Sequence, residues 1–205
     1  MSNDPLLKYR EQHQHRLNYM PWLYWTLKPK HRAWAEAWQA EYQAYLMDME
    51  TVEIGKNCFI SPLAHIFAEP GRHIKIGDNS FIAADCTLHG PLEIGNEVAI
   101  NHHCILDGGK AGIKLHDQVR IAAYSHLYAF DHGMDIQRPI YQQAVTSKGI
   151  EIGQDVWLGA HVGIKDGIKI GAHAVVGMHS MVTKNVEDRA VVAGNPARLI
   201  RYRNK

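Results

Sequence analysis

Histidine is the residue type that first points to chemistry in this chain. It occurs 14 times in 205 residues. A regular apolar pattern stops at a polar segment, residues 131–149, which contains His132, and His126 lies shortly before this segment. A neutral imidazole, with a pKa of about 6.5, can remove a proton from a substrate at neutral pH. Three neutral imidazoles can instead hold a zinc ion. Two kinds of site therefore have to be considered, a general base and a metal centre.

The overall composition restricts the class of protein. The formal net charge of +1 argues against nucleic-acid binding through a basic surface, and no run of 18 apolar residues predicts a transmembrane helix. The first residues lack the apolar core of a signal peptide, and three cysteines provide no disulfide framework. We therefore expect a cytoplasmic protein with free thiols, without a membrane span and without a nucleic-acid partner.

An internal repeat supplies the elements that must position these histidines. From Val52 to Asn185 the chain divides into 18 hexapeptides, interrupted by three insertions, and the third residue of each is Ile, Leu or Val. The first residue is always small or aliphatic, and all three cysteines occupy this position: Cys58, Cys86 and Cys104. Each hexapeptide is a short strand with a turn, whose inward side chains are buried only when equivalent side chains stack on them.

Three hexapeptides make one coil of 18 residues, because Ile-Gly recurs in the first hexapeptide of each group except at Leu115–His116. Six such coils, with neighbouring strands about 4.8 Å apart, predict a three-faced parallel β prism. Glycine follows the third position in seven hexapeptides, and we expect it there as a turn residue with positive φ. Asn101 occupies the same fourth position, and asparagine also tolerates positive φ.

The segments outside the repeat define the organisation of the chain. Residues 1–50 form an N-terminal helical segment, residues 51–201 the β domain with an inserted loop at 131–149, and residues 202–205 a basic tail with a solvated end. Large side chains at three- and four-residue steps line one face of the second predicted helix: Trp34, Trp38, Tyr42, Tyr45 and Met49. We expect this face to cover the open end of the prism or a neighbouring subunit rather than to bind an acceptor.

The C-terminal hexapeptides resemble those of a known family. The elements IGQDVWLG, SMVTK and AGNPARLIR, with the repeat that precedes them, are similar to the hexapeptide-repeat acyltransferases, in particular the acetyl-CoA-dependent galactoside, maltose and serine acetyltransferases. The resemblance implies a mainly β fold, a left-handed parallel β-helix of about six 18-residue coils with an N-terminal α-helical segment. It also implies a homotrimer, with acetyl-CoA in the groove between two prisms and no metal.

The same resemblance implies a set of cofactor-binding residues. Trp157 would lie beside the groove, the backbone near Ala160 and Met178 would meet the pantetheine arm, and cationic side chains would face the phosphates. The full set is Trp157, Ala160, Met178, Thr183, Lys184, Arg198 and Arg201.

The segment FDHGMDIQRPIYQQ resembles the long loop of the family, in which a histidine is followed by PI-x-x-Q. The catalytic histidine then corresponds to His132, which would take the proton of an acceptor hydroxyl as it attacks acetyl-CoA directly. His126 is the alternative base or a wall of the same cleft, and Asp107 either contacts the acceptor or caps a turn. The implied acceptor-binding residues are Asp107, Asn101, His102, His126 and Asp131.

Three functions stay open at this point. The first is acetyl-CoA-dependent O-acetylation of a small molecule, such as a sugar or glycan precursor. The second is a γ-class zinc carbonic anhydrase, although no histidine pair has the metal-binding spacing; the third is a non-catalytic β-solenoid binding protein. The loop reads Ala-Phe-Asp-His where the galactoside branch has Thr-Gly-His. The acceptor, the choice between O- and N-acetylation and the length of the acyl group therefore stay open.

Overall fold

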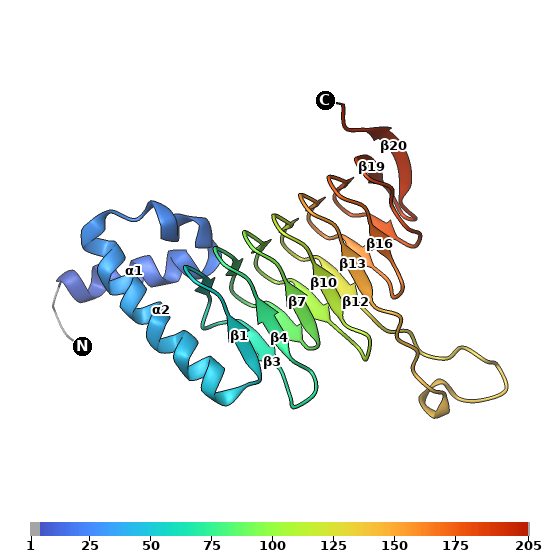
Figure 1. The fold of residues 1–205 in the computed structure, drawn as a ribbon, viewed down its shortest axis with the longest axis horizontal. Helices are drawn as coiled ribbons and strands as arrows, with labels where there is room; N and C mark the ends of the chain where they lie inside the picture. The colour runs from blue at the N-terminus through green and yellow to red at the C-terminus, as the bar shows by residue number, and fades with distance from the viewer. Residues whose placement is uncertain (1–4, 205) are drawn as a thin grey trace.

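Three parallel sheets of short strands wind around one core in the computed structural model, which describes residues 5–204, with side chains from residue 7 onward (Figure 1). The ends of the predicted helical segment and basic tail, residues 1–4 and Lys205, lie outside the described residues. The helices come first: α1 (Pro5–Tyr19), the 3-10 helix η1 (Pro21–Thr26) and α2 (Pro29–Met49). The strands follow in regular rotation among the three sheets, which we name A, B and C.

Each sheet takes every third strand of the chain. Sheet A contains β1 (Val52–Ile54), β4 (Ile74–Ile76), β7 (Leu92–Ile94), β10 (Ile113–Leu115), β13 (Ile150–Ile152) and β16 (Lys169–Ile170). Sheet B contains β2 (Phe59–Ile60), β5 (Phe81–Ile82), β8 (Ala99–Ile100), β11 (Arg120–Ile121), β14 (Trp157–Leu158), β17 (Val175–Val176), β19 (Ala190–Ala193) and β20 (Arg198–Tyr202). Sheet C contains β3 (His65–Phe67), β6 (Thr87–His89), β9 (Ile105–Asp107), β12 (His126–Tyr128), β15 (Gly163–Ile164) and β18 (Met181–Val182).

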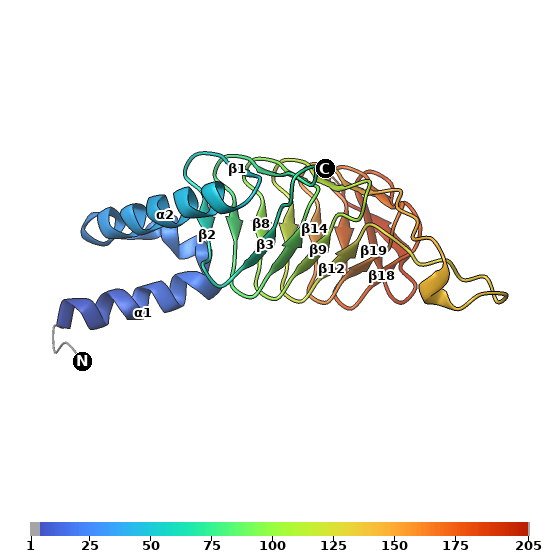
Figure 2. The ribbon, with the colours of Figure 1, turned by 90° about the horizontal axis from the view of Figure 1, so that it is seen from below.

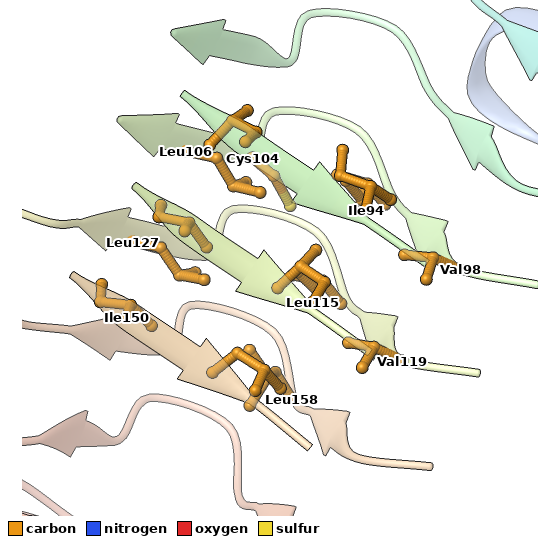
Figure 3. Packing of buried hydrophobic residues seen from close by; sticks show 14 of the residues in the cluster. Ile94, Val98, Cys104, Leu106, Leu115, Val119, Leu127, Ile150 and Leu158 are labelled. Carbon is orange, nitrogen blue, oxygen red and sulfur yellow. The ribbon is translucent and has the colours of Figure 1, made fainter. Parts of the chain in front are cut away.

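The core consists of rows of equivalent side chains from successive coils. Ile94 pairs in register with Leu115, and Leu106 pairs with Leu127, all of them buried inside the prism (Figure 3). The three cysteines are buried free thiols in the same core. The predicted prism of about six coils with N-terminal helices is therefore confirmed, as are the thiols. The left-handed sense of the coil stays a prediction from the family resemblance.

The glycines after the third position have a role different from the one predicted. Positive φ occurs two residues further on, for example at Asn79 and His103, and not at these glycines. At Gly77 a Cβ atom would lie 2.6 Å from the carbonyl carbon of Gly95, so glycine is needed because adjacent coils approach closely. The prediction of positive φ is also wrong at Asn101, which instead uses its side-chain amide to donate a hydrogen bond to the Ile121 carbonyl of the next coil (2.9 Å).

Helix α2 covers the open edge of the first coil, as expected for a cap, but it does so with polar side chains. The buried Gln39 accepts a hydrogen bond from the Ile60 N–H (2.8 Å) and donates one to the Ile60 carbonyl (3.1 Å). Gln43 donates to the Cys58 carbonyl (2.9 Å). These amides replace the strand that the edge of sheet B lacks, and buried backbone groups require such partners.

The predicted aromatic face of α2 is only partly correct. Trp34 and Trp38 pack against a buried cluster, and Tyr42 packs against the main core. Tyr45 and Met49, however, are 59% and 61% exposed. The face of α2 that covers the prism is rotated relative to the predicted aromatic face, because Gln39 must meet the edge strand. Ala35 and Leu46 lie on the same side of the helix as Gln39 and are therefore buried with it.

The N-terminal elements lie at the first-coil end of the prism (Figure 2). Their side chains also pack against the outer face of sheet B in the first coils. Phe59 and Phe81 project outward from β2 and β5 and contact aromatic rings of η1 and α2, with ring centroids 6.1 Å apart for Trp25 and Phe81. Leu17 and Tyr24 are buried in the same cluster. The helical segment therefore fixes the tryptophans of η1 beside sheet B, close to the middle of the prism. Among the described residues, no helix combines the length and the apolarity needed to cross a membrane.

The C-terminal segment folds back onto the prism, although its residues from Arg198 to Asn204 are exposed. Strand β19 continues sheet B in parallel, and β20 pairs with it in the antiparallel sense. Beyond β20, the Arg203 guanidinium lies 3.0 Å from the Asp155 carboxylate, and the Tyr202 hydroxyl donates to Glu187. Arg203 is exposed, as predicted for a solvated end, but its guanidinium is also held by this carboxylate.

We predict that Gln39→Leu lowers the free energy of unfolding by about 1–3 kcal/mol, because it leaves the N–H and the carbonyl of Ile60 buried without partners. Glu41→Leu, at an exposed position of the same helix, is the matched control and should change stability by about 0.5 kcal/mol or less. Urea denaturation followed by circular dichroism measures both. Equal stabilities for the two variants would contradict the role of Gln39 as an edge cap.

Candidate active site

The predicted site residues lie on separate parts of the prism. The B–C corner, formed by the turns at residues 101–104, 122–125, 159–162 and 177–180, carries Asn101, His102, Ala160 and Met178. The C–A corner and its loop carry Asp107, Asp131 and His132. His126 is exposed on the outer face of sheet C. Trp157, Arg198 and Arg201 belong to strands β14 and β20 of sheet B, whereas Thr183 and Lys184 follow β18 of sheet C at the end of the last coil.

The long loop between β12 and β13 projects from the C–A corner beyond the body of the prism (Figures 1 and 2). His132 is exposed on it, with an edge-to-face contact to Phe130 at a ring-centroid distance of 6.1 Å. Asp131 pairs through its backbone with Thr146, and its carboxylate lies 3.5 Å from the Lys165 amine. The structure therefore brings Asp131 beside His132 but leaves the imidazole facing outward.

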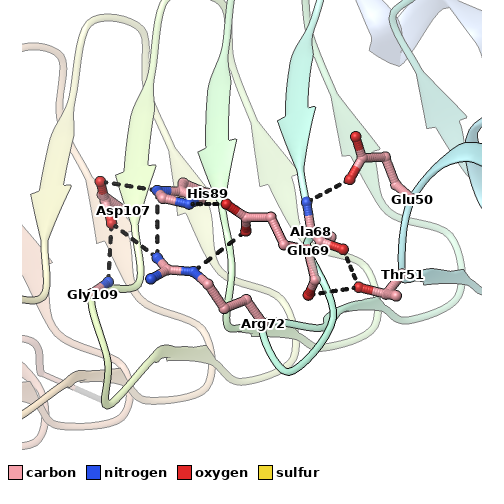
Figure 4. A network of polar contacts seen from close by, with 8 residues as sticks. All are labelled: Glu50, Thr51, Ala68, Glu69, Arg72, His89, Asp107 and Gly109. Atoms are coloured by element: carbon pink, nitrogen blue, oxygen red, sulfur yellow. Dashed lines mark hydrogen bonds and ion pairs between the residues drawn. The ribbon is translucent and has the colours of Figure 1, made fainter.

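Asp107 belongs to a polar network on the C–A corner (Figure 4). One carboxylate oxygen accepts a hydrogen bond from the Gly109 N–H (3.0 Å), so Asp107 does cap the turn. The other lies 3.4 Å from Nδ1 of His89, whose Nε2 lies 3.1 Å from Glu69. Arg72 Nη2 lies 3.7 Å from Asp107. An acceptor that contacts Asp107 would therefore meet a carboxylate whose orientation is already fixed.

Charge pairing within this network affects Glu69 most clearly. Backbone hydrogen bonding, followed by the His89 ring and the nearby Arg72, lowers the pKa of the Glu69 carboxyl group. Arg72 Nε lies 3.5 Å from Glu69 Oε2, which is an ion-pair distance without hydrogen-bond geometry. Two carboxylates, one guanidinium and one imidazole thus share a single surface patch across three coils.

A column of aromatic rings lines the B–C corner. His103 stacks on Tyr124 (4.7 Å between ring centroids, 14° between planes), and Tyr124 stacks on His161 (4.9 Å, 4°). His161 stacks in turn on His179 (4.6 Å, 8°). The rings project in one direction because each residue occupies the same positive-φ position of its turn. Ala160 and Met178 immediately precede two of these rings, so a chain bound along their backbone would run beside a flat aromatic wall.

His102 lies inside this corner, against the rings of Tyr19 (6.0 Å) and Tyr124 (5.6 Å). Its Nδ1 atom is buried without a hydrogen-bond partner among the described residues. Burial and the neighbouring His103 lower the pKa of His102, and Asp85 opposes this shift. His102 is half-buried, so its ring is packed on one side and accessible on the other, and its contact with an acceptor stays a prediction.

The outer face of sheet B carries two cavities that meet at Arg120. The lower one, of about 510 Å³, is lined by Trp22, Trp25, Phe81 and Asn101, together with Asn79, Glu97 and Ala99. Trp22 is 48% exposed, so the face of an indole ring is open to a ligand. The Arg120 guanidinium is fixed by a hydrogen bond to the Glu97 carbonyl (2.9 Å) and keeps further N–H groups for the cavity.

The upper cavity, of about 300 Å³, is lined by Trp157, Arg201, Arg203 and Arg120, with Asp155, Val156, Val175 and Val191. His173 and Arg203 lower the pKa of the Asp155 carboxyl group by hydrogen bonding, so Asp155 stays ionised beside the arginines. A separate cavity of about 250 Å³ beyond the last coil is lined by Lys184 and Arg198, among others. The predicted phosphate-binding cations therefore divide between two cavities on the two sides of β20.

No single protomer brings the whole predicted set together. His132 lies on the loop of the C–A corner, which is the corner opposite sheet B in a three-faced prism. A further cavity, of about 620 Å³ on sheet A, is lined by none of the predicted residues. Within residues 5–204, no three or more His, Cys, Asp or Glu side chains gather closely enough to hold a metal ion.

Several residues of these sites were missed by sequence reasoning, although the repeat contains a signal for them. His89 and Asp107 are 18 residues apart, at the fourth position of equivalent hexapeptides. Arg120 and Trp157 are 37 residues apart. Without the 19-residue insertion between them the separation is 18 residues, the length of one coil. The stacked rings all occupy the sixth position of a hexapeptide. Trp22 and Trp25 carried no such signal, because η1 lies outside the repeat.

Comparisons with known proteins identify relatives of this chain. Residues 149–184 match the family model described as bacterial transferase hexapeptide (six repeats). The chain is 32% identical over 136 residues to a probable acetyltransferase of Mycobacterium tuberculosis, covering 66% of this chain and 44% of that protein. It is 29% identical to the galactoside O-acetyltransferase of Escherichia coli over 153 residues, or 74% of this chain and 64% of the relative.

A solved structure is also similar over most of its length. It is a variant of AntD, an N-acyltransferase from Bacillus cereus, in complex with dTDP-4-amino-4,6-dideoxyglucose and coenzyme A. The sequence identity is 31% and the TM-score 0.70, and the match covers 80% of this chain and 90% of that one.

We predict that the His102 imidazole titrates below its ordinary value of 6.5. His103→Gln should raise the His102 pKa, because it removes a neighbouring positive charge, and Asp85→Asn should lower it. A folded pKa below the unfolded one also means that stability declines as the pH falls below about 6.5. NMR titration of the imidazole Cε1–H resonances measures these shifts. A His102 pKa above 6.5 would show that the charge of Asp85 outweighs burial and the neighbouring His103.

Proposed function

Because the chain belongs to the hexapeptide-repeat acetyltransferase family, we propose that it transfers an acetyl group from acetyl-CoA to a hydroxyl of a small molecule, a sugar or glycan precursor. The observation that carries this proposal is the placement of an exposed imidazole on a projecting loop, opposite a sheet face rich in arginine and tryptophan. Such a pair of surfaces can meet only between two protomers. The active site is then shared, and the functional unit is a homotrimer.

Within this site His132 acts as the general base. It removes the acceptor proton while the acceptor oxygen attacks the thioester carbonyl, a new ester bond forms, and the carbon–sulfur bond of acetyl-CoA breaks. The coenzyme A thiolate leaves and takes up a proton. Asp131, the residue before His132, ties the start of the loop to the prism, because its backbone pairs with Thr146 and its carboxylate lies 3.5 Å from the Lys165 amine.

The cations on and around β20 bind the donor. Arg201 lines the upper cavity with Trp157, and Lys184 lines a cavity with Arg198, so fixed positive charge is available on both sides of the strand. Guanidinium groups suit phosphate oxygens through paired hydrogen bonds. The exposed backbone at Ala160 and Met178 offers amide partners to an extended pantetheine arm. Thr183 is exposed at the end of the last coil, directly before Lys184, where its hydroxyl can meet the nucleotide end of the donor.

The lower cavity on sheet B supports a sugar as acceptor. Indole faces at Trp22 and Trp25 suit the apolar face of a pyranose ring, and Asn101, Asn79, Glu97 and Arg120 provide hydrogen-bond partners for its hydroxyls. The volume of about 510 Å³ is within the range of small-molecule sites. An acceptor bound there would place its reacting hydroxyl near Arg120, where the lower and upper cavities meet.

An amino sugar is the second candidate acceptor. The AntD structure, 31% identical to this chain, belongs to an N-acyltransferase and contains an amino sugar nucleotide. A panel of sugars, sugar nucleotides and their 4-amino derivatives distinguishes the two possibilities, with release of free thiol from acetyl-CoA as the readout. Turnover confined to amines would replace the hydroxyl in the proposal, and no turnover with any acceptor would contradict the enzyme activity itself.

We predict that His132→Ala lowers kcat by about 100- to 10,000-fold, because the acceptor loses its general base. The Kd for acetyl-CoA should stay within about twofold, since the loop histidine does not hold the donor. Steady-state kinetics and isothermal titration calorimetry measure the two quantities. His126→Ala, on the neighbouring strand, is the control and should keep most of the activity. Loss of turnover in His126→Ala alone would assign the base to His126.

A mixing experiment tests whether the site crosses two protomers. His132→Ala and Arg201→Ala should each have little activity at low acetyl-CoA concentration, the first through kcat and the second through KM. Trimers formed by co-expression of the two variants should recover activity, because one kind of interface then contains an intact His132 and an intact Arg201. Activity equal to the sum of the separate variants, or a monomer by light scattering, would contradict the shared site.

A further inference from the structure

The loop that carries His132 has little regular structure to hold its shape. It contains one short helix, η2 (Ile140–Gln142), and one pair of backbone hydrogen bonds between Asp131 and Thr146. Its large apolar side chains face outward; Ile136 is 98% exposed and Tyr141 is 83% exposed. A packed core therefore does not determine where His132 lies within the protomer.

The base of the loop is attached to the prism by two polar side chains. Asp166, which is 5% exposed, accepts hydrogen bonds from the N–H groups of Lys148 (2.8 Å) and Gly149 (2.9 Å). Ser147 accepts hydrogen bonds from the N–H groups of Lys110 (3.0 Å) and Ala111 (2.9 Å). These contacts fix where the loop returns to the coil, but they lie at its end and not beside His132.

Gln143 supplies the missing contact in the outer part of the loop. Its Oε1 accepts a hydrogen bond from the Asp135 N–H (2.8 Å), and its Nε2 donates to the carbonyls of Asp135 (2.8 Å) and Arg138 (2.8 Å). Both donor hydrogens of the amide are thus used. The side chain is half-buried, whereas its neighbours Gln142 and Ala144 are exposed.

The same side chain lies against the residue that follows His132. A Cβ atom built on Gly133 would lie 2.7 Å from Gln143 Oε1 and 2.8 Å from Gln143 Cβ. Glycine is therefore required at position 133, because a larger residue would collide with Gln143. The close contact also fixes the distance between the backbone next to His132 and the Gln143 side chain. The His132 ring makes an edge-to-face contact with Phe130. The position of the backbone at residues 132 and 133 therefore determines the direction in which the imidazole projects.

We propose that Gln143 is a positioning residue, which clamps the outer loop through its side-chain amide and thereby orients His132 for proton transfer. This proposal rests on the proposed role of His132 as the base. It also explains the glutamine that follows Pro-Ile in the loop motif, which the mechanism above does not use. A misplacement of a catalytic group by about 1 Å can cost about 100-fold in rate, so a clamp distant from the chemistry can control kcat.

The test compares Gln143→Leu with Gln142→Leu in the full-length protein. Gln142 is the matched control, because it is the adjacent glutamine and its amide donates only to the Tyr141 hydroxyl in the structure. Gln143→Leu should lower kcat by about 10- to 100-fold and leave the KM for acetyl-CoA within about twofold. Gln142→Leu should change neither. Gly133→Ala, which displaces the amide without removing it, should lower kcat in the same direction.

Two measurements are independent of turnover. In Gln143→Leu the Asp135 amide should exchange faster with deuterium, and the Cε1–H resonance of His132, assigned by its loss in His132→Ala, should shift or broaden. An unchanged His132 resonance, or a kcat no lower than that of Gln142→Leu, would overturn the proposal. If His132→Ala stays active while the resonance still responds to Gln143→Leu, the base assignment is wrong and the positioning of His132 by Gln143 is supported.

Discussion

The rest of the structure depends on one constraint, the stacking of inward aliphatic side chains from coil to coil. A strand of two or three residues has too few hydrogen bonds to be stable alone, and its core side chain is buried only by equivalents above and below, as for Leu106 and Leu127. Because each coil contacts only its neighbours, the corners and outer faces are free to vary. The ends of the stack are the exception, and Gln39 at one end and β20 at the other supply the missing partners.

The three outer faces have become different surfaces on this common core. On sheet A, glutamate and lysine alternate from strand to strand, with ion pairs such as Glu93–Lys114 (3.3 Å) and Glu151–Lys169 (3.0 Å), so this face is satisfied by its own charges. On sheet B, the helices cover the first coils and leave Arg120 and Trp157 open in the later ones. Sheet C ends at the corner from which the loop projects. Sheet B and the loop are thus the surfaces whose charged and aromatic side chains are left open to a ligand. The proposed donor, acceptor and base lie on these two surfaces.

The repeat made most of the fold predictable, and its limits follow from the same physics. Burial restricts the inward positions to aliphatic or small residues. The period of these residues along the sequence therefore predicted the core, the six coils and the burial of the three cysteines as free thiols. The function of the fourth-position glycines was misread, because close approach between coils depends on the neighbouring coil and not on the local turn. Likewise, Tyr45 and Met49 fit the apolar period of a helix face. In the structure, however, the hydrogen bonds between Gln39 and the backbone of Ile60 determine which face of α2 meets the prism, and Tyr45 and Met49 are left exposed. Contacts that depend on two distant segments, such as Trp25 with Phe81, have no local pattern from which to predict them.

The same reasoning explains why the loop needs its own internal contacts. A solenoid is stiff along its stack because every coil is held on two sides, but an insertion at a corner loses both neighbours at once. The attachment at Asp166 restores order only at the point of return. Toward the tip, order has to come from within the loop, and a side-chain amide is well suited to this because it can accept from one backbone group and donate to two others, as Gln143 does. In this fold the rigid core determines where the loop begins and ends, and the polar contacts inside the loop determine where its histidine lies.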